Sequence, residues 1–228
     1  NLIVWTPAGW QPVNLAGTPP GFEPLVPMSL ADGTERHLYL MGSVANSWYM
    51  YKRIGATWQP SGICYRDCPP FQYAGPVMSA DFGTGSRIYG IAFRQGQSSM
   101  VEVVRSDPGG WTSLGTSDGS VKTMVVFDDG TGPALYAVGD FTTINGVDTQ
   151  GLAKWNGLVW SSVMPPGTRL FGRDMTVVAD LGDGPAIYIN GTVFYEGIDH
   201  WGVSKWAGQE WTFLGAPDQL PPPSTPRY

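Results

Sequence analysis

The feature that most constrains the fold of this chain is an internal repeat of about 50 residues. Tryptophans recur at intervals of 48, 53, 49 and 51 residues, at Trp10, Trp58, Trp111, Trp160 and Trp211. Tyrosines recur at intervals of 50, 47 and 52 residues, at Tyr39, Tyr89, Tyr136 and Tyr188. A Met precedes each Tyr by 11 to 13 residues, and a small residue (Gly42, Ala92, Gly139 or Gly191) follows it by three. A fixed period of this length indicates one supersecondary unit repeated along the chain.

Each repeat contains four short runs rich in Val, Ile, Tyr and Trp. In the third copy they lie within Met124–Gly139 and Gly151–Trp160, and in the fourth within Met175–Gly191 and Gly202–Trp211. Turn residues (Gly, Asp and Asn) separate the runs, which is the pattern of short antiparallel strands joined by tight hairpins. We name the predicted strands of a unit a (from the Met), b (around the Tyr), c and d (from the last Trp).

The composition excludes several classes of protein. The 228 residues include 31 Gly and 20 Pro, too many for long helices and therefore for an all-α fold. With 42% hydrophobic and 13% aromatic residues, the chain has enough apolar material for a packed core. The net charge of −6 and the lack of a basic cluster argue against nucleic acid as a partner. No apolar run is long enough to insert into a membrane.

Radial repetition of four-stranded antiparallel units predicts an all-β fold, a β-propeller. Complete blades are expected at about 28–63, 78–115, 124–164 and 175–215, and residues 1–13 supply only strands c and d of another. The segment 216–228 is rich in Pro and is expected to be a tail or linker. The half blade, and Asn1 in place of Met, favour a piece of a longer propeller. Flanking sequence or another chain would then close the ring.

The third copy carries a family resemblance. The resemblance lies in Leu135–Gly146 (LYAVGDFTTING), Gly151–Gly157 (GLAKWNG) and Val159-Trp160. These segments resemble kelch-like repeats, which are related to the central propeller of galactose oxidase. Such repeats occur in large secreted bacterial proteins and in fungal cortical polarity-marker proteins. The fourth copy fits in its flanks, and the first two fit in part. The resemblance implies a secreted or cell-surface protein, but it supplies no copper site or other cofactor here, since the only histidines are His37 and His200.

Loop lengths indicate where a ligand would bind. The a–b and c–d turns are short and similar, whereas the b–c and d–a connections vary: Gly42 to Trp48 spans 6 residues, and Gly139 to Gln150 spans 11. Variable loops on one face of a rigid scaffold usually carry the binding residues.

On that face we select Trp48 and Trp201, at a position that Gln150 fills in the third copy. A Trp missing from half of the copies is available to stack on a sugar or an aromatic partner. The alternative is a side chain packed beneath its own loop. Glu196, Asp199 and His200 lie close to Trp201 in sequence and complete the candidate ligand-binding set, without a catalytic assignment.

Strand c carries a recurring basic residue, six positions before the last Trp. It is Lys52, Arg105, Lys154 or Lys205. We expect the aliphatic stems to cover neighbouring apolar surface and the charged ends to be solvated.

Two local motifs are given structural interpretations. Cys64 and Cys68 are predicted to form a disulfide within the longest connection, which implies an oxidising compartment. They are too few ligands for a zinc site. The acidic stretches Asp128–Gly132 and Asp180–Gly184 lack the ligand spacing of a calcium loop and are predicted to be hairpin turns. No metal site is expected.

Three functions follow from these observations. The first is a non-catalytic extracellular module for protein interaction, adhesion or cell-surface assembly, which needs only a rigid scaffold and a variable loop face. The second is a carbohydrate-binding propeller in which Trp48 and Trp201 stack on sugars. The third is a propeller enzyme, which ranks last because no catalytic constellation recurs among the repeats. The expected partner is therefore a protein or a glycan on the b–c and d–a loop face.

Overall fold

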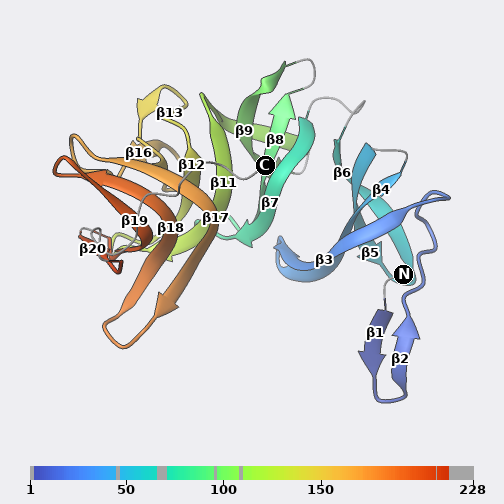
Figure 1. Ribbon diagram of the computed structural model, residues 1–228. Coiled ribbons are helices and arrows are strands. Elements are labelled where there is room, and N and C mark those ends of the chain that lie inside the picture. Colours follow the sequence, from blue (N-terminus) through green and yellow to red (C-terminus); the bar gives the residue numbers. More distant parts are fainter. Residues whose placement is uncertain are drawn as a thin grey trace, which may run out of the picture. The chain divides into compact units, whose positions relative to one another are not determined.

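A computed structural model describes residues 3–44, 47–65, 71–94, 97–107, 110–208 and 210–215. All regular structure in these ranges is antiparallel β-sheet, which confirms the prediction of an all-β fold. No helix able to span a bilayer occurs in these ranges. The chain divides into two compact units, Asn1–Leu114 and Gly115–Tyr228, and each is described by itself. Figure 1 labels most of the strands.

The first unit begins with a hairpin of β1 (Ile3–Thr6) and β2 (Gly9–Pro12). A four-stranded sheet follows, made of β3 (Glu23–Asp32), β4 (Glu35–Val44), β5 (Ser47–Ile54) and β6 (Thr57–Tyr65). The next four strands, paired in chain order, are β7 (Phe71–Ala80), β8 (Arg87–Arg94), β9 (Gln97–Asp107) and β10 (Gly110–Ser117). The last residues of β10 belong to the second unit, where Ser117 pairs with Ile144 of β13 (Thr143–Ile144). With β14 (Val147–Asp148), β13 extends this sheet to six strands in the order β14-β13-β10-β9-β8-β7.

The second unit contains two further four-stranded sheets. One is formed by β11 (Ser120–Asp128), β12 (Pro133–Asp140), β15 (Leu152–Trp155) and β16 (Trp160–Ser162). The short hairpin of β13 (Thr143–Ile144) and β14 (Val147–Asp148) is inserted between β12 and β15. The other sheet is formed by β17 (Arg169–Asp180), β18 (Pro185–Tyr195), β19 (Ile198–Trp206) and β20 (Trp211–Phe213). Each of the four sequence repeats thus corresponds to four strands paired in order a, b, c, d.

The small residue that follows each Tyr is explained by a β-bulge. Each strand a begins four to seven residues before its Met, and its register with strand b shifts in all four sheets at or next to that small residue. The bulge brings backbone close to the small residue: a Cβ on Gly139 would lie 2.1 Å from the carbonyl oxygen of Ser120, and one on Gly191 would lie 2.4 Å from that of Phe171. The glycines at these positions are therefore explained by a close backbone approach, while the second repeat has Ala92 at the equivalent place.

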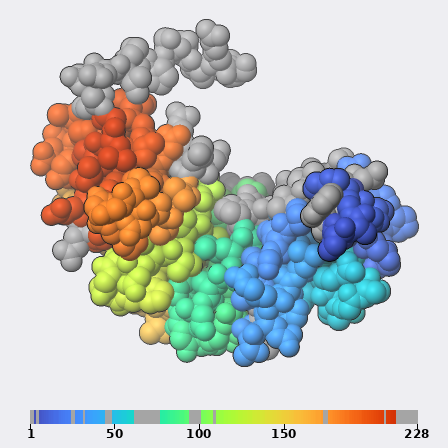
Figure 2. Space-filling model, turned by 90° about the horizontal axis from the view of Figure 1, so that it is seen from below, coloured from blue at the N-terminus to red at the C-terminus, as the bar shows by residue number. Residues whose placement is uncertain are grey.

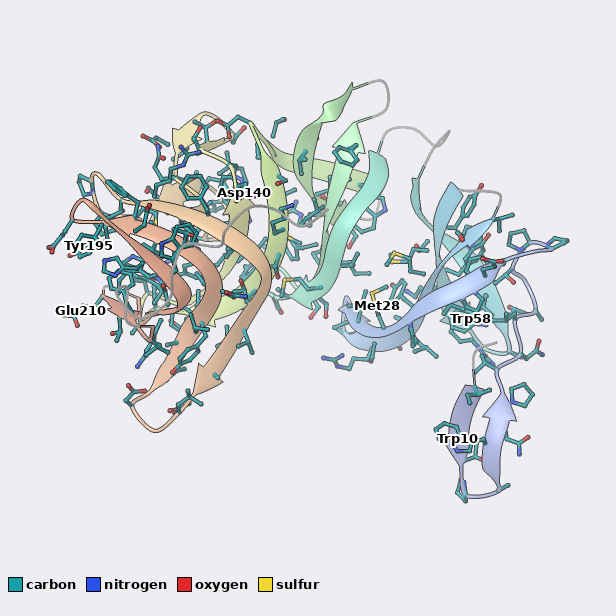
Figure 3. All side chains as sticks on the ribbon, in the orientation of Figure 1. Trp10, Met28, Trp58, Asp140, Tyr195 and Glu210 are labelled. Atoms are coloured by element: carbon teal, nitrogen blue, oxygen red, sulfur yellow. The ribbon has the colours of Figure 1, made fainter. Side chains whose placement is uncertain are left out.

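The core of the second unit lies between its two sheets. The side chains of Tyr136, Val138 and Leu152 pack in one cluster with Ile187 and Ile189 of β18. In Figure 2 the yellow-green segment that includes β11 lies directly against the orange segment of β17 and β18. In the first unit, Tyr39 and Met50 join Leu30 and Ile88 in one cluster, so neighbouring sheets share a core there too. All four repeat tyrosines are buried, whereas the first repeat tryptophan, Trp10 on β2, is exposed (Figure 3).

The prediction that the basic residues of strand c have solvated ends is wrong for Lys154 and Lys205. Both residues are 9% exposed. Lys154 Nζ lies 2.5 Å from Asp129 Oδ2 and donates to Thr131 Oγ1 at 2.7 Å, while Lys205 pairs with Asp183. The acidic partner comes from the a–b turn of the same sheet in each case, a cross-strand contact that linear spacing did not reveal.

The acidic a–b turns are hairpin turns, as predicted. Asp128 Oδ1 accepts hydrogen bonds from the backbone N–H groups of Gly130 and Gly132, both at 2.9 Å. Asp180 Oδ1 does the same for Gly182 and Gly184. These carboxylates bind their own loop backbone, which fixes the turn between strands a and b.

Candidate functional site

A polar cavity of about 330 Å³ lies in the second unit, where the b–c and d–a connections of the β11–β16 sheet meet. Its wall is formed by Asp148, Gln150, Ser162 and the segment Met164–Arg169. Small-molecule sites usually measure about 300 to 1,000 Å³, so the cavity is at the lower end of that range. It lies on the side from which the variable loops emerge.

The b–c side of the cavity is held by a network around Asp118. Its carboxylate accepts hydrogen bonds from the backbone N–H groups of Thr142 and Thr143, at 2.8 and 2.9 Å, and from the Thr142 hydroxyl. Burial alone would raise the pKa of Asp118, but these hydrogen bonds hold it below its ordinary value. The network anchors the start of β13, because it ties the residues that follow β12 to the turn between β10 and β11.

Gln150 adopts a left-handed backbone conformation at the cavity wall, with φ of 50°. Its N–H donates to Thr142 O at 3.0 Å, and its carbonyl accepts from Leu170 N at 2.9 Å. The next residue is Gly151, where a Cβ would lie 2.1 Å from the Leu170 carbonyl oxygen. Non-glycine residues held in this region cost roughly 1–3 kcal/mol and cluster at functional sites.

The d–a side of the cavity is a turn closed by Thr168. The Thr168 side chain and backbone N–H both donate to Pro165 O, and the residue is buried. Pro165 and Pro166 restrict the backbone further, since each ring fixes φ. Both walls are therefore rigid, which suits a preformed site.

The cavity lining contains hydrogen-bond donors and acceptors, and it includes both a negatively charged residue, Asp148, and a positively charged one, Arg169. Gln150 Nε2 donates to Asp148 Oδ1 at 2.6 Å, which orients the Asp148 carboxylate. The guanidinium of Arg169 lies 4.3 Å from the centroid of the Phe171 ring. Arg169 Nε is buried, and no described residue accepts a hydrogen bond from it.

Arg169 also begins a row of side chains on one face of the β17–β20 sheet. Residues directly opposite one another in antiparallel strands point to the same face. Arg169 lies opposite Phe194, and Phe194 lies opposite Asp199 on the next strand. The neighbouring row on that face consists of Phe171, Thr192 and Trp201. Phe171 and Phe194 are 39% and 37% exposed. Three aromatic residues therefore share one face with the arginine of the cavity.

The five residues selected from the sequence are not all brought together. Asp199 and Trp201 lie in adjacent rows of the same face. His200 points to the opposite face, where its ring stacks on Phe213 at a centroid distance of 3.7 Å and Tyr195, labelled in Figure 3, lies at 6.5 Å. Glu196 is an exposed residue in the two-residue turn between β18 and β19, with φ of 51°.

Three selected residues lie partly or wholly outside the described part of the structure. Trp48 is in β5 and pairs with Tyr65, but its side chain is outside the described residues. The same holds for the Cys64 side chain, and Cys68 is wholly outside them. The disulfide and the role of Trp48 stay predictions.

Sequence reasoning did not select Arg169 or Phe171. Their signal is the alternation in Arg169-Leu170-Phe171, which fits a strand with one buried face. The repeat pattern, however, places the start of strand a at its Met, later in the sequence. Gln150 is the counterpart of Trp48 and Trp201 in the repeat, and in the β11–β16 sheet it lines the cavity.

Comparison with protein-family models, curated proteins and solved structures gave no match. Within the described ranges, no three His, Cys, Asp or Glu side chains gather in a group that could hold a metal ion.

Proposed function

We propose that this chain is a non-catalytic carbohydrate-binding module, secreted or displayed at a cell surface, built on a propeller-type scaffold. The four strands of each of the four repeats would be a complete blade, and the β1–β2 hairpin the outer half of another. The ligand site would be the cavity between the b–c and d–a connections together with the adjoining aromatic face.

The observation that carries this proposal is the position of Arg169, which belongs both to the polar cavity and to the face that carries Phe171 and Trp201. A sugar presents hydroxyl groups at its edge and a less polar C–H surface on its ring face. Gln150, Asp148 and Arg169 offer hydrogen bonds to the first, and aromatic rings pack well against the second.

Binding to a glycan array, followed by titration calorimetry with the best ligand, tests the proposal. We expect Trp201→Ala and Gln150→Ala each to weaken binding at least about tenfold, which is the loss of roughly 1.4 kcal/mol. Leu158→Ala is the matched control, because Leu158 is 82% exposed in the β15–β16 turn and lies outside the cavity lining. An array without a single bound saccharide contradicts the proposal.

One observation favours the second candidate, a protein-assembly function. In the β11–β16 sheet, Leu152 is fully buried in the core shared with β17–β20. Its counterpart in the next repeat, Val203, lies on the equivalent face of β19 and is 43% exposed, and Val177 on the same face is 57% exposed. An exposed apolar strip of this kind is typical of interaction surfaces.

Sedimentation velocity separates this candidate from the first. If the strip mediates assembly, the chain associates with itself or with a partner, and Val177→Glu abolishes that association while glycan binding persists. Val177 lies opposite Tyr188, farther along the sheet from Trp201 than Val203 is. A wild-type chain that stays monomeric and captures no partner removes the support for assembly.

A further inference from the structure

We propose, building on the proposed carbohydrate-binding function, that the ligand is an acidic saccharide of the uronate type, and that Arg169 binds its carboxylate. This inference goes beyond glycan binding because it names the charged group that the cavity selects.

The state of Arg169 is the first argument. A guanidinium has five N–H donors, all of which need acceptors when they are removed from water. The Phe171 ring, 4.3 Å away, covers one face of the group, and Nε is buried without an acceptor among the described residues. The planar group thus packs on an aromatic ring, and its Nε–H donor has no acceptor among the described residues. A carboxylate is the acceptor that matches the forked geometry of Arg.

The charges around Arg169 restrict how an acidic ligand would lie. Asp148, the acidic residue of the cavity lining, is oriented by Gln150 through the 2.6 Å hydrogen bond, and Asp199 is two strands away in the row of Arg169. Both would repel a ligand carboxylate placed beside them. The carboxylate therefore lies at Arg169, and the hydroxyl groups of the sugar donate to Asp148 and contact Gln150.

The charge of the whole chain favours a weakly charged anion over a polyanion. At a net charge of −6, a densely sulfated glycan meets long-range repulsion that a single contact with Arg169 does not overcome. A saccharide with one carboxylate in the cavity meets much less. The predicted class is thus a uronate-containing oligosaccharide and not a sulfated one.

Titration calorimetry of the full chain tests this with three probes: an oligogalacturonate, its methyl ester and a sulfated oligosaccharide of equal length. We expect the free acid to bind at least about tenfold more tightly than the ester, because hydrogen bonds to charged groups contribute more than neutral ones. We expect Arg169→Gln to reduce binding of the acid to the level of the ester, and Arg169→Lys to recover only part of it. Arg36→Gln is the control, since Arg36 is an exposed arginine of the first unit that bonds Ser29.

Each outcome has a separate meaning. Equal affinity of the wild-type chain for acid and ester, or tighter binding of the sulfated probe, overturns the uronate inference and leaves carbohydrate binding intact. This comparison needs no variant, so it holds even if Arg169→Gln does not fold. If neither these probes nor any neutral glycan binds, the proposed function itself fails.

Discussion

At the scale of single residues, the clearest feature is the difference between two lysines at the same repeat position. Lys154 pairs with Asp129, whose side chain is 8% exposed, whereas the partner of Lys205 is Asp183, whose side chain is 66% exposed. Removing one member of a buried pair leaves a charge without compensation and typically costs about 3–5 kcal/mol. An exposed partner is solvated by water instead.

We therefore predict that Lys154→Met lowers the free energy of unfolding by about 3 kcal/mol or more, and that Lys205→Met has a much smaller effect. Urea unfolding followed by tryptophan fluorescence measures both. The two lysines have the same place in their sheets, so each variant controls for the loss of the aliphatic stem. Equal losses in the two variants would show that burial of the acidic partner is not the deciding factor.

The same pair predicts how stability depends on pH. Burial alone would raise the pKa of Asp129, but hydrogen bonds from Lys154, Thr131 and Tyr136 outweigh it and hold that pKa well below its ordinary value. A carboxyl group with a depressed pKa in the folded state stabilises the protein above its unfolded pKa, about 3.9. That contribution is lost as the pH falls from about 4 toward the folded-state pKa.

We expect the midpoint of urea unfolding to fall steeply between about pH 4 and pH 2, and we expect Asp129→Asn to make this dependence shallower. Asp183→Asn is the comparison, because the pKa of Asp183 is also lowered, chiefly by its hydrogen bond with Lys205, but the group is exposed. A wild-type slope that Asp129→Asn leaves unchanged would assign the acid sensitivity to other carboxyl groups.

At the scale of the strand pair, the bulge opposite strand b explains a sequence constraint. A Cβ at Gly139 would lie 2.1 Å from Ser120 O, a backbone atom that cannot move without shifting β11. Gly90, in strand b of the second repeat, has only ordinary contacts, the nearest at 3.7 Å. Both glycines lie in strand b, Gly139 next to the end of β12 and Gly90 in the middle of β8, so Gly90 is a comparison in the same element.

We predict that Gly139→Ala destabilises the protein by about 1–3 kcal/mol, the usual cost of overpacking, and that Gly90→Ala is tolerated. Thermal unfolding of the two variants against wild type measures the difference. If Gly139→Ala were as stable as Gly90→Ala, the bulge would have to shift freely, and the small residue after each Tyr would lose its explanation.

The strand order within a repeat was predictable from the sequence, because the Tyr and Trp ladders and the turn residues mark strands b and d directly. The start of strand a was not, since the bulge lets the strand continue before its Met, as Arg169 and Phe171 show. The ion pair of Lys154 could not be predicted from the sequence either. Its partner Asp129 lies 25 residues away, and only the pairing of β11, β12 and β15 brings the two side chains together.

Most of the residues that make up the candidate site could not be predicted from the sequence. Loop-length variation indicated the b–c and d–a side, where the cavity lies. Trp201 and Asp199 share a face because they are two residues apart on one strand, and His200, between them, must point the other way. Closeness in the sequence therefore does not place His200 on the same face as Asp199 and Trp201. Phe171 and Phe194 lie on the same face as Trp201 because of the pairing register of the strands. The repeated Trp and Tyr positions contain no information on that register.

At the scale of the whole molecule, the core clusters of the described residues can each be assigned to one of the two compact units. The cluster around Tyr136 and Ile187 belongs to the second unit, and the clusters around Tyr39 and Tyr51 belong to the first. The cavity is lined only by residues of the second unit. A ligand that binds the folded form at 100 times its Kd stabilises that form by about 2.7 kcal/mol.

We predict that a saturating saccharide slows hydrogen exchange in the second unit, most strongly in β14 and at the start of β17, and leaves β3–β6 unchanged. The reason is that exchange through local opening responds only where the opening breaks the site, and the whole cavity lining belongs to the second unit. Exchange followed by mass spectrometry of peptides from each unit measures this, with the Gln150→Ala chain and the same ligand as control. Equal slowing in both units would mean that they open as one cooperative body, and the ligand would then act on the stability of the entire chain.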